Sequence, residues 1–316
     1  MCVNLHTNSL LDSLVTYILK SGQSVTLMIT HENMSLADVE LALQWAADEG
    51  WNPGLDDASA FFESDKSGFF MVRDKGETVA CISVVKQGIN SGFLGLYICH
   101  PLHRGQGSGW AVWQAGMQYL EGRTIGLDGV PEQQANYQKS GFEFHYRNVR
   151  YSGKANGLYS GNELTALLNN SSLVIREPEP GDFNSVLQLD YLVHGINRYT
   201  YLQSWLSISP TRKTLICEYK NQLVGFGTIR ACINGFKIGP LIAQRTDITH
   251  MLVSALANSC STNELILDVP EPNNAAVDLV ESLGLAHTFE TARMYRGTAP
   301  HYQLQSLFGV TSFELG

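Results

Sequence analysis

Residues 99–109, CHPLHRGQGSG, place an arginine and three glycines between a strand-like and a helix-like segment. Backbone N–H groups at the start of a helix attract anions, and the helix dipole adds to that preference. Gly105, Gly107 and Gly109 would let a phosphate approach the backbone, and the Arg104 guanidinium would add positive charge. The segment therefore predicts an anion-binding loop, while its glycines taken alone are more typical of an ordinary turn.

Two common nucleotide-binding patterns do not account for this loop. A P-loop requires Gly-Lys followed by Ser or Thr, and no such triplet follows the glycines. A dinucleotide-binding fingerprint follows the first strand of a doubly wound sheet, whereas this loop follows the fourth predicted strand. Neither class of nucleotide site is therefore expected here.

The chain contains an internal repeat. Four pairs of similar segments are separated by 143, 140, 143 and 144 residues, measured at Gly92 and Gly235, Asp128 and Asp268, Gly141 and Gly284, and Gly153 and Gly297. A nearly constant offset over separate blocks predicts two copies of one fold rather than a short-repeat solenoid. We expect an N-terminal helical extension at 1–24, a first domain at 25–153, a linker at 154–172, a second domain at 173–297 and a C-terminal tail at 298–316.

The first copy alternates strand-like and helix-like segments. Strands are predicted at 24–29, 68–74, 77–87, 92–98, 124–130 and 142–152, the last of which closes the sheet. Helices are predicted at 35–50, 110–122 and 131–140, and the second copy repeats this order. The pattern predicts an α/β (α+β) class, in which each copy is a mixed, mostly antiparallel sheet flanked by helices.

Three motifs of the first copy resemble the acyl-CoA-binding core of the GCN5-related N-acetyltransferase (GNAT) superfamily. They are YICHP at 97–101, RGQGSG at 104–109 and NYQKSGF at 136–142. The resemblance covers residues 25–153 and implies two tandem GNAT domains, the second of them diverged. The blocks EGWNPG at 49–54 and IGLDGV at 125–130 resemble a tandem GNAT subgroup.

The resemblance implies that acetyl-CoA is the co-substrate. The pyrophosphate of coenzyme A would bind the loop, its pantetheine arm would pair with the preceding strand, and a tyrosine would lie near the thioester sulfur. The implied residues are Arg104, Gly105, Gln106, Gly107, Ser108 and Gly109 in the loop, Leu96, Tyr97, Ile98 and Cys99 in the strand, and Asn136 and Tyr137 in the next helix. One departure is Val130, which stands where the family often has an asparagine seven residues before the tyrosine.

Acetyl transfer to an amine requires a neutral nitrogen. Alkyl amines are mostly protonated near pH 7, as the lysine reference pKa of about 10.4 shows, so a carboxylate or an ordered water must remove the proton. Asp128, at the end of a predicted strand, and Glu49, in the EGWNPG block, are the two candidate bases. Tyr137 is the candidate hydrogen-bond donor to the leaving sulfur.

Residues 47–62 continue from the end of the first predicted helix and bring an aromatic ring close to carboxylates. Trp51, Asn52 and Asp56 fit a wall that binds a cationic acceptor. An ordered loop held by its tryptophan explains the same residues equally well, so both interpretations stand.

The second copy lacks the glycine-rich loop and the tyrosine of the first copy. Its loop, AQRTDIT at 243–249, has no glycine, and Val280 takes the place of the tyrosine. We expect that this copy does not bind coenzyme A in the same way, and that it shapes the substrate cleft or a homodimer.

Composition narrows the class of partner. With 44% hydrophobic and 16% charged residues the chain is globular, and a net charge of -9 argues against a nucleic-acid partner. Its nine histidines and six cysteines show no metal-ligand spacing, so no metal is expected.

The N-terminus lacks the features of a signal peptide, and no run reaches the ~18 apolar residues that cross a bilayer. We therefore expect a cytoplasmic protein without a membrane partner.

Together these features predict an N-acetyltransferase that acts on a small amine by direct attack in a ternary complex. A non-catalytic acyl-CoA sensor is the alternative. Tyr137 favours the enzyme, because a sensor needs no proton donor at the sulfur.

Overall fold

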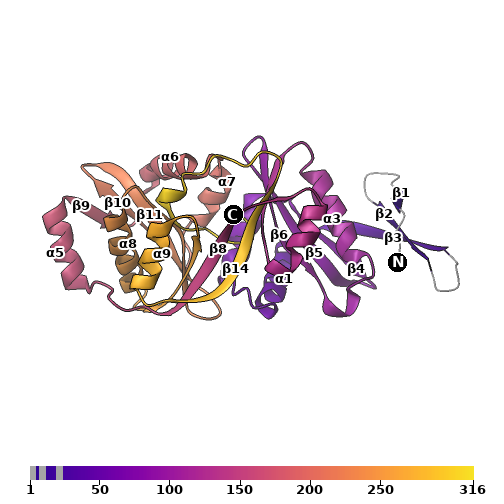
Figure 1. Ribbon diagram of the computed structural model, residues 1–316, viewed down its shortest axis with the longest axis horizontal. Coiled ribbons are helices and arrows are strands. Elements are labelled where there is room, and N and C mark those ends of the chain that lie inside the picture. The colour runs from indigo at the N-terminus through magenta and orange to yellow at the C-terminus, as the bar shows by residue number, and fades with distance from the viewer. Residues whose placement is uncertain (1–4, 7–11, 19–23) are drawn as a thin grey trace.

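The computed structural model describes residues 5–6, 12–18 and 24–316, with side chains from residue 30 onward. Figure 1 shows two halves side by side, and one continuous sheet runs through both. Among the described residues, no helix is both long enough and apolar enough to cross a membrane.

The N-terminal half follows the predicted alternation. Its strands are β3 (Ser24–Asn33), β4 (Phe69–Asp74), β5 (Glu77–Gln87), β6 (Ser91–Cys99) and β7 (Thr124–Gly129), and its helices are α1 (Leu36–Asp48), α2 (Asp57–Ser64), α3 (Ser108–Tyr119) and α4 (Gln134–Lys139). Successive residues of a strand point to opposite faces. Phe70 and Val72 accordingly pack with α3, whereas Phe69 and Met71 pack with α1 and α2.

The C-terminal half repeats this design. Its elements are α5 (Gly161–Ser171), β9 (Leu173–Arg176), α6 (Phe183–His194), α7 (Tyr199–Trp205), β10 (Arg212–Tyr219), β11 (Gln222–Ala231), β12 (Phe236–Ala243), α8 (Thr246–Ser259), β13 (Glu264–Pro270), α9 (Asn274–Ser282) and β15 (Leu307–Gly309). Ile216 packs with α6, and its neighbours Leu215 and Cys217 pack with α8 on the other face. The mixed, mostly antiparallel sheet with helices on both faces confirms the predicted fold class.

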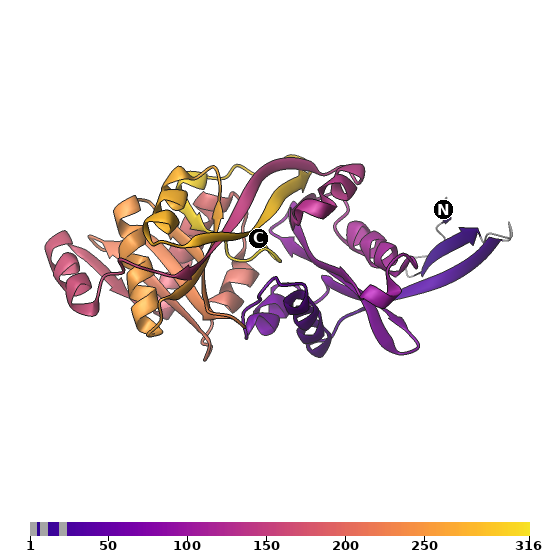
Figure 2. The ribbon, with the colours of Figure 1, turned by 60° about the horizontal axis from the view of Figure 1, so that its bottom comes forward.

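The two copies exchange their last strands. β8 (Glu143–Lys154) lies between β14 (Ala286–Arg296) and β13, not beside β7. β14 pairs with β7, with Ala292 opposite Gly129. The prediction that residues 142–152 close the first sheet is therefore wrong. Either long strand has the pattern of a buried antiparallel strand, and such a pattern does not specify which neighbour it pairs with. Figure 2 shows these two strands running together between the halves.

The predicted helical extension at 1–24 is also wrong in its described part. β1 (Leu5–His6) and β2 (Asp12–Ile18) are strands, and β2 pairs with β3 from Asp12 opposite Thr30 to Ile18 opposite Ser24. Residues 15–18 are β-branched or aromatic, which favours a strand once a partner is available. The helix prediction rested on five apolar residues, of which Leu14 and Val15 lie in β2 and Leu10, Leu11 and Leu19 lie outside the described residues.

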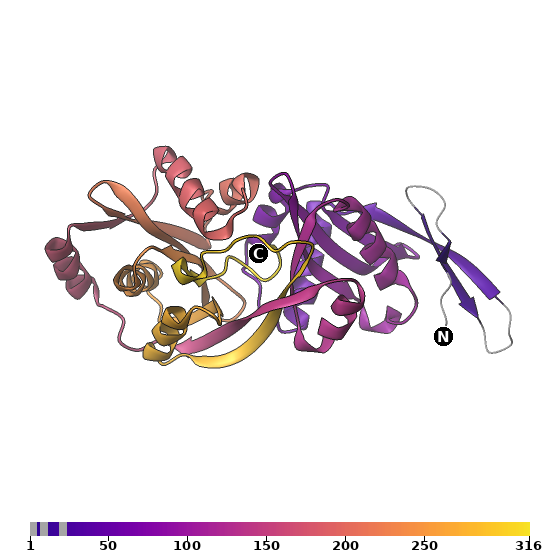
Figure 3. The ribbon, with the colours of Figure 1, turned by 45° about the horizontal axis from the view of Figure 1, so that its top comes forward.

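The segments expected to be a linker and a tail are both structured. The 154–172 connector contains α5, which begins with a capping box in which the Ser160 N–H donates to Glu163 Oε2 at 2.8 Å. The 298–316 tail contains β15, and residues 307–316 are all buried. Figure 3 shows the C-terminus ending between the halves rather than at their outer surface.

Candidate active site

A wedge opens between β6 and β7. These parallel strands pair from Ser91 and Thr124 to Leu94 and Leu127 and then separate, although β6 continues to Cys99. Leu96 has a φ of 45° where the β5–β6 register shifts. Such a bulge bends the strand, so the edge of β6 beyond Leu94 turns away from β7 and faces the wedge.

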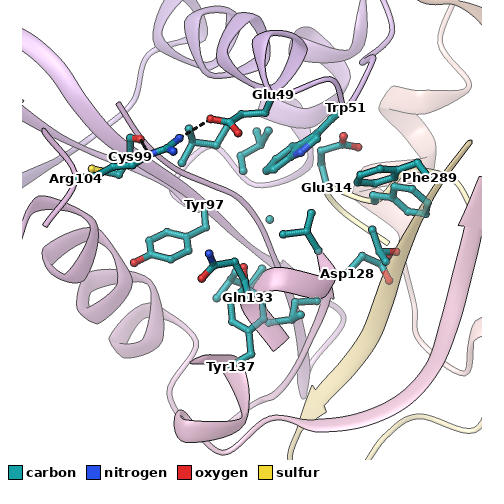
Figure 4. A pocket seen from close by; sticks show the side chains of 18 residues that line it. Glu49, Trp51, Tyr97, Cys99, Arg104, Asp128, Gln133, Tyr137, Phe289 and Glu314 are labelled. Carbon is teal, nitrogen blue, oxygen red and sulfur yellow. Dashed lines mark hydrogen bonds and ion pairs between the residues drawn. The ribbon is translucent and has the colours of Figure 1, made fainter. Parts of the chain in front are cut away.

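A cavity of about 310 Å³ lies at this wedge and is lined by both halves of the chain (Figure 4). It brings together most of the candidates from the sequence. The N-terminal half contributes Glu49, Trp51, Leu94, Gly95, Leu96, Tyr97, Ile98, Cys99, Arg104, Leu127, Asp128, Val130, Gln133 and Tyr137, and the C-terminal half contributes Phe289, Thr291, Phe313 and Glu314.

The glycine-rich loop connects the end of β6 to the start of α3. Gly107 caps α3 with a φ of 89°, a left-handed conformation that glycine adopts without strain. Arg104 folds back, with Nε donating to the Cys99 carbonyl at 3.0 Å and Nη2 to Glu49 Oε1 at 2.5 Å. Within the loop Arg104 lines the cavity, whereas Gly105, Gln106, Gly107, Ser108 and Gly109 are not among its lining residues.

Tyr137 lies on α4, and its side chain packs against the N-terminal sheet and α3. Its ring stacks on Trp113 with centroids 5.8 Å apart, and a Cβ added at Gly129 would lie 2.6 Å from its Cε2 atom. Burial raises the pKa of Tyr137 well above the usual tyrosine value and raises the pKa of Tyr97 to about 12. Both phenols therefore stay protonated at neutral pH. Asn136 does not line the cavity, and its Nδ2 donates to Gln133 at 2.9 Å.

Both candidate bases are paired with arginines. The Arg293 guanidinium on β14 donates to the two carboxylate oxygens of Asp128 at 2.8 and 2.7 Å, and Asn148 also donates to Asp128 at 2.8 Å. Glu49 accepts from Arg104, as described above. Asp128 thus ties β7 to β14, and Glu49 ties the end of α1 to the glycine-rich loop.

The three candidate substrate residues separate in the structure. Trp51 lines the cavity, and its carbonyl accepts a hydrogen bond from Arg150 at 2.7 Å. Asn52 instead bonds the backbone of Asn234 through both ends of its amide, at 2.9 and 3.0 Å. Asp56 accepts a hydrogen bond from the Ser209 hydroxyl. Asn52 and Asp56 therefore connect the two halves and do not line the cavity.

Sequence reasoning missed the four lining residues from the C-terminal half. Phe289 and Thr291 reach the cavity only because β14 crosses into the N-terminal sheet. Phe313 and Glu314 reach it because the C-terminal segment is buried between the halves. The one sequence feature that could have pointed to Glu314 is that it is the single acidic residue in the mainly apolar segment LFGVTSFELG at 307–316.

The second copy has a similar wedge with a different occupant. β12 and β13 pair from Phe236 and Leu265 to Ile238 and Leu267, and beyond that point β15 pairs with β12. The chain's own C-terminal segment thus pairs with the edge of β12 that corresponds to the open edge of β6. This pairing supplies a physical reason for the expectation that the second copy binds no coenzyme A there.

Comparison with known proteins gives the same family for both halves. An acetyltransferase (GNAT) family profile matches residues 36–142, and an acetyltransferase (GNAT) domain profile matches residues 186–309. Holothin acyltransferase from Pseudoalteromonas sp. (strain SANK 73390) is 28% identical over 288 residues, which cover 91% of this chain and 94% of that protein.

Two solved structures share the fold over most of the chain. A putative acetyltransferase from Pyrococcus horikoshii has a TM-score of 0.73 at 19% identity, covering 91% of this chain and 96% of its own. A tandem GNAT protein from the clavulanic acid biosynthesis pathway has a TM-score of 0.58 at 14% identity, covering 84% and 98%. The profiles, the relative and the folds agree, and the chain belongs to the GNAT acetyltransferases, with two GNAT domains in tandem.

Proposed function

We propose that this chain transfers the acetyl group of acetyl-CoA to the amine of a small acceptor by direct attack in a ternary complex. Acyl transfer in general is the chemistry of the family and of the acyltransferase relative. The observation that carries the proposal is the wedge between β6 and β7, which Tyr137 lines and which no strand of the described residues occupies.

The residues at this wedge suit an acyl-CoA. The edge of β6 from Leu96 to Cys99 faces the cavity and can pair with an extended amide chain. The α3 N-terminus, reached through Gly107 and joined by Arg104, suits a pyrophosphate. A bound acyl-CoA would supply the acyl group as an activated thioester. Tyr137, protonated at neutral pH, would donate a hydrogen bond to the departing sulfur.

The proposal is tested by free-thiol release from acetyl-CoA with a panel of primary amines, beside calorimetric titration of coenzyme A. Gly107→Glu places a carboxylate at the start of α3 and should weaken coenzyme A binding at least about tenfold, by like-charge repulsion and by loss of the glycine conformation. Thr246→Glu, at the exposed first residue of α8 in the second copy, is the matched control and should leave binding unchanged.

Kinetics separate the proposed mechanism from its alternatives. Direct attack predicts intersecting initial-rate lines when both substrates vary, whereas an acetyl-enzyme intermediate gives parallel lines. Coenzyme A binding without thiol release for any amine would favour an acyl-CoA sensor. Equal affinity in wild type and Gly107→Glu would contradict the proposed cofactor position.

A further inference from the structure

Glu314 is a buried carboxylic acid on the C-terminal segment that lines the cavity. The residue is 3% exposed, and Figure 4 shows its side chain between Trp51 and Phe289. Its backbone is closely fixed, because a Cβ added at Gly95 of β6 would lie 2.1 Å from the Glu314 carbonyl oxygen. The chain comes this close to β6 only because residue 95 is a glycine.

The residues on either side of Glu314 are held by hydrogen bonds. The Leu315 N–H donates to the Ser312 hydroxyl at 3.1 Å, and its carbonyl accepts from Gln87 Nε2 at 2.6 Å. Arg198 donates to the Gly316 carbonyl at 2.5 Å. These contacts join the C-terminus to β5 and to the start of α7. The Glu314 side chain is therefore held in the cavity by a rigid backbone.

Glu314 differs from the other two carboxylates that line the cavity. Asp128 and Glu49 each accept hydrogen bonds from an arginine. The Oε1 atom of Glu314 is buried and has no hydrogen-bond partner among the described residues, and the side chain forms no ion pair with them. A buried carboxylate oxygen without a donor is costly unless a ligand supplies one.

Resting on the proposed function, we propose that Glu314 is the group that accepts the proton of the acceptor amine. The Glu314 carboxylate removes one proton from the bound ammonium ion, giving a neutral amine and a carboxylic acid. The nitrogen lone pair then forms the N–C bond to the acyl carbon while the C–S bond breaks. The second nitrogen proton passes to the departing sulfur, and Glu314 returns its proton to solvent.

The surroundings of Glu314 suit this role. Burial raises the pKa of its carboxyl above the usual glutamate value, and the nearby Asp57 carboxylate on α2 adds to that rise. Lys237 on β12, Arg150 on β8 and Arg230 on β11 oppose it. A base whose pKa is raised toward neutrality is a better match for proton transfer near pH 7.

The walls around Glu314 indicate the kind of acceptor. Trp51, Phe289 and Phe313 line the same part of the cavity, and the two phenylalanine rings lie 6.2 Å apart. Aromatic walls next to a carboxylate fit a primary amine attached to a flat apolar group. The C-terminal half thus supplies the acceptor end of the site, opposite the cofactor end supplied by β6 and α3.

The test compares Glu314→Gln, Glu314→Asp and the exposed control Glu40→Gln with two probe amines. 2-Phenylethylamine is protonated at neutral pH, whereas aniline is not. With 2-phenylethylamine we expect kcat to fall about 100-fold or more in Glu314→Gln, with partial recovery in Glu314→Asp. With aniline, which needs no initial deprotonation, the fall should be less than about tenfold. Melting temperature and acetyl-CoA affinity, measured on the same samples, should remain close to wild type.

The dependence of kcat on pH distinguishes a proton-accepting role of Glu314 from a purely structural one. Because the carboxylate is the active form, wild-type kcat should rise with pH through the raised Glu314 pKa, and this acidic limb should vanish in Glu314→Gln. An unchanged limb, or equal losses with both amines, would overturn the assignment while leaving acetyl transfer intact. If the wild type acetylated neither these probes nor the wider amine panel, the proposed function itself would fail, and the role of Glu314 with it.

Discussion

Replacing Asp128 distinguishes a structural ion pair from a catalytic base. Arg293 is 1% exposed, and both of its hydrogen bonds to a carboxylate go to Asp128. Asp128→Asn would leave that guanidinium buried without a counter-charge, which costs about 3–5 kcal/mol in comparable buried pairs. With an unfolding entropy of about 2.1 cal/mol/K per residue over the 316-residue chain, this loss corresponds to a fall of about 4–8 °C in melting temperature.

The assay is thermal unfolding followed by circular dichroism, beside acetyl-CoA affinity and thiol release. Asp278→Asn, at an exposed position of α9, is the matched control and should leave melting unchanged. The fall in melting temperature caused by Asp128→Asn should be smaller when it is measured in an Arg293→Met background. In that background no buried charge is left unpaired by the loss of the carboxylate. An unchanged melting temperature together with loss of the acidic limb of kcat would refute this reasoning and identify Asp128 as the base.

Two further substitutions follow from the site. Tyr137→Phe should lower kcat about 100-fold without changing acetyl-CoA affinity, as measured by thiol release and calorimetry; wild-type turnover would show that Tyr137 only packs on Trp113. Gly95→Ala should destabilise the chain by about 1–3 kcal/mol, because its Cβ would lie 2.1 Å from the Glu314 carbonyl oxygen. Urea unfolding measures this loss, and Gly161→Ala, where an added Cβ meets nothing within 4 Å, should show none.

Local patterns predicted the strands and helices that carry several of the candidate residues. The loop from Arg104 to Gly109 follows β6 and begins α3, as its glycines and the flanking apolar runs indicated. Tyr137 lines the same cavity as Tyr97 and Cys99, although 40 residues separate it from Tyr97. Such a motif can be predicted from the sequence because the position of a residue in its own strand or helix fixes the direction of its side chain.

Contacts between distant segments were not predictable in this way. Asp128 lies near the end of β7, as the sequence indicated, but its partner Arg293 lies 165 residues away on a strand that the sequence assigned to the other copy. The hairpin of β2 and β3 was missed for a similar reason, since a short apolar segment becomes a strand only when a neighbour supplies its hydrogen bonds.

The sequence by itself determined that the chain carries two copies of one mixed sheet, that only the first has the glycine-rich loop and tyrosine, and where those residues stand. These are properties of local spacing and repetition. The tertiary structure decided that β8 and β14 change places, and that the C-terminal segment pairs with β12 and then brings Glu314 to the first wedge. The physical reason is that strand pairing and burial depend on which distant segment offers a complementary edge. The sequence of one strand does not specify which segment that is.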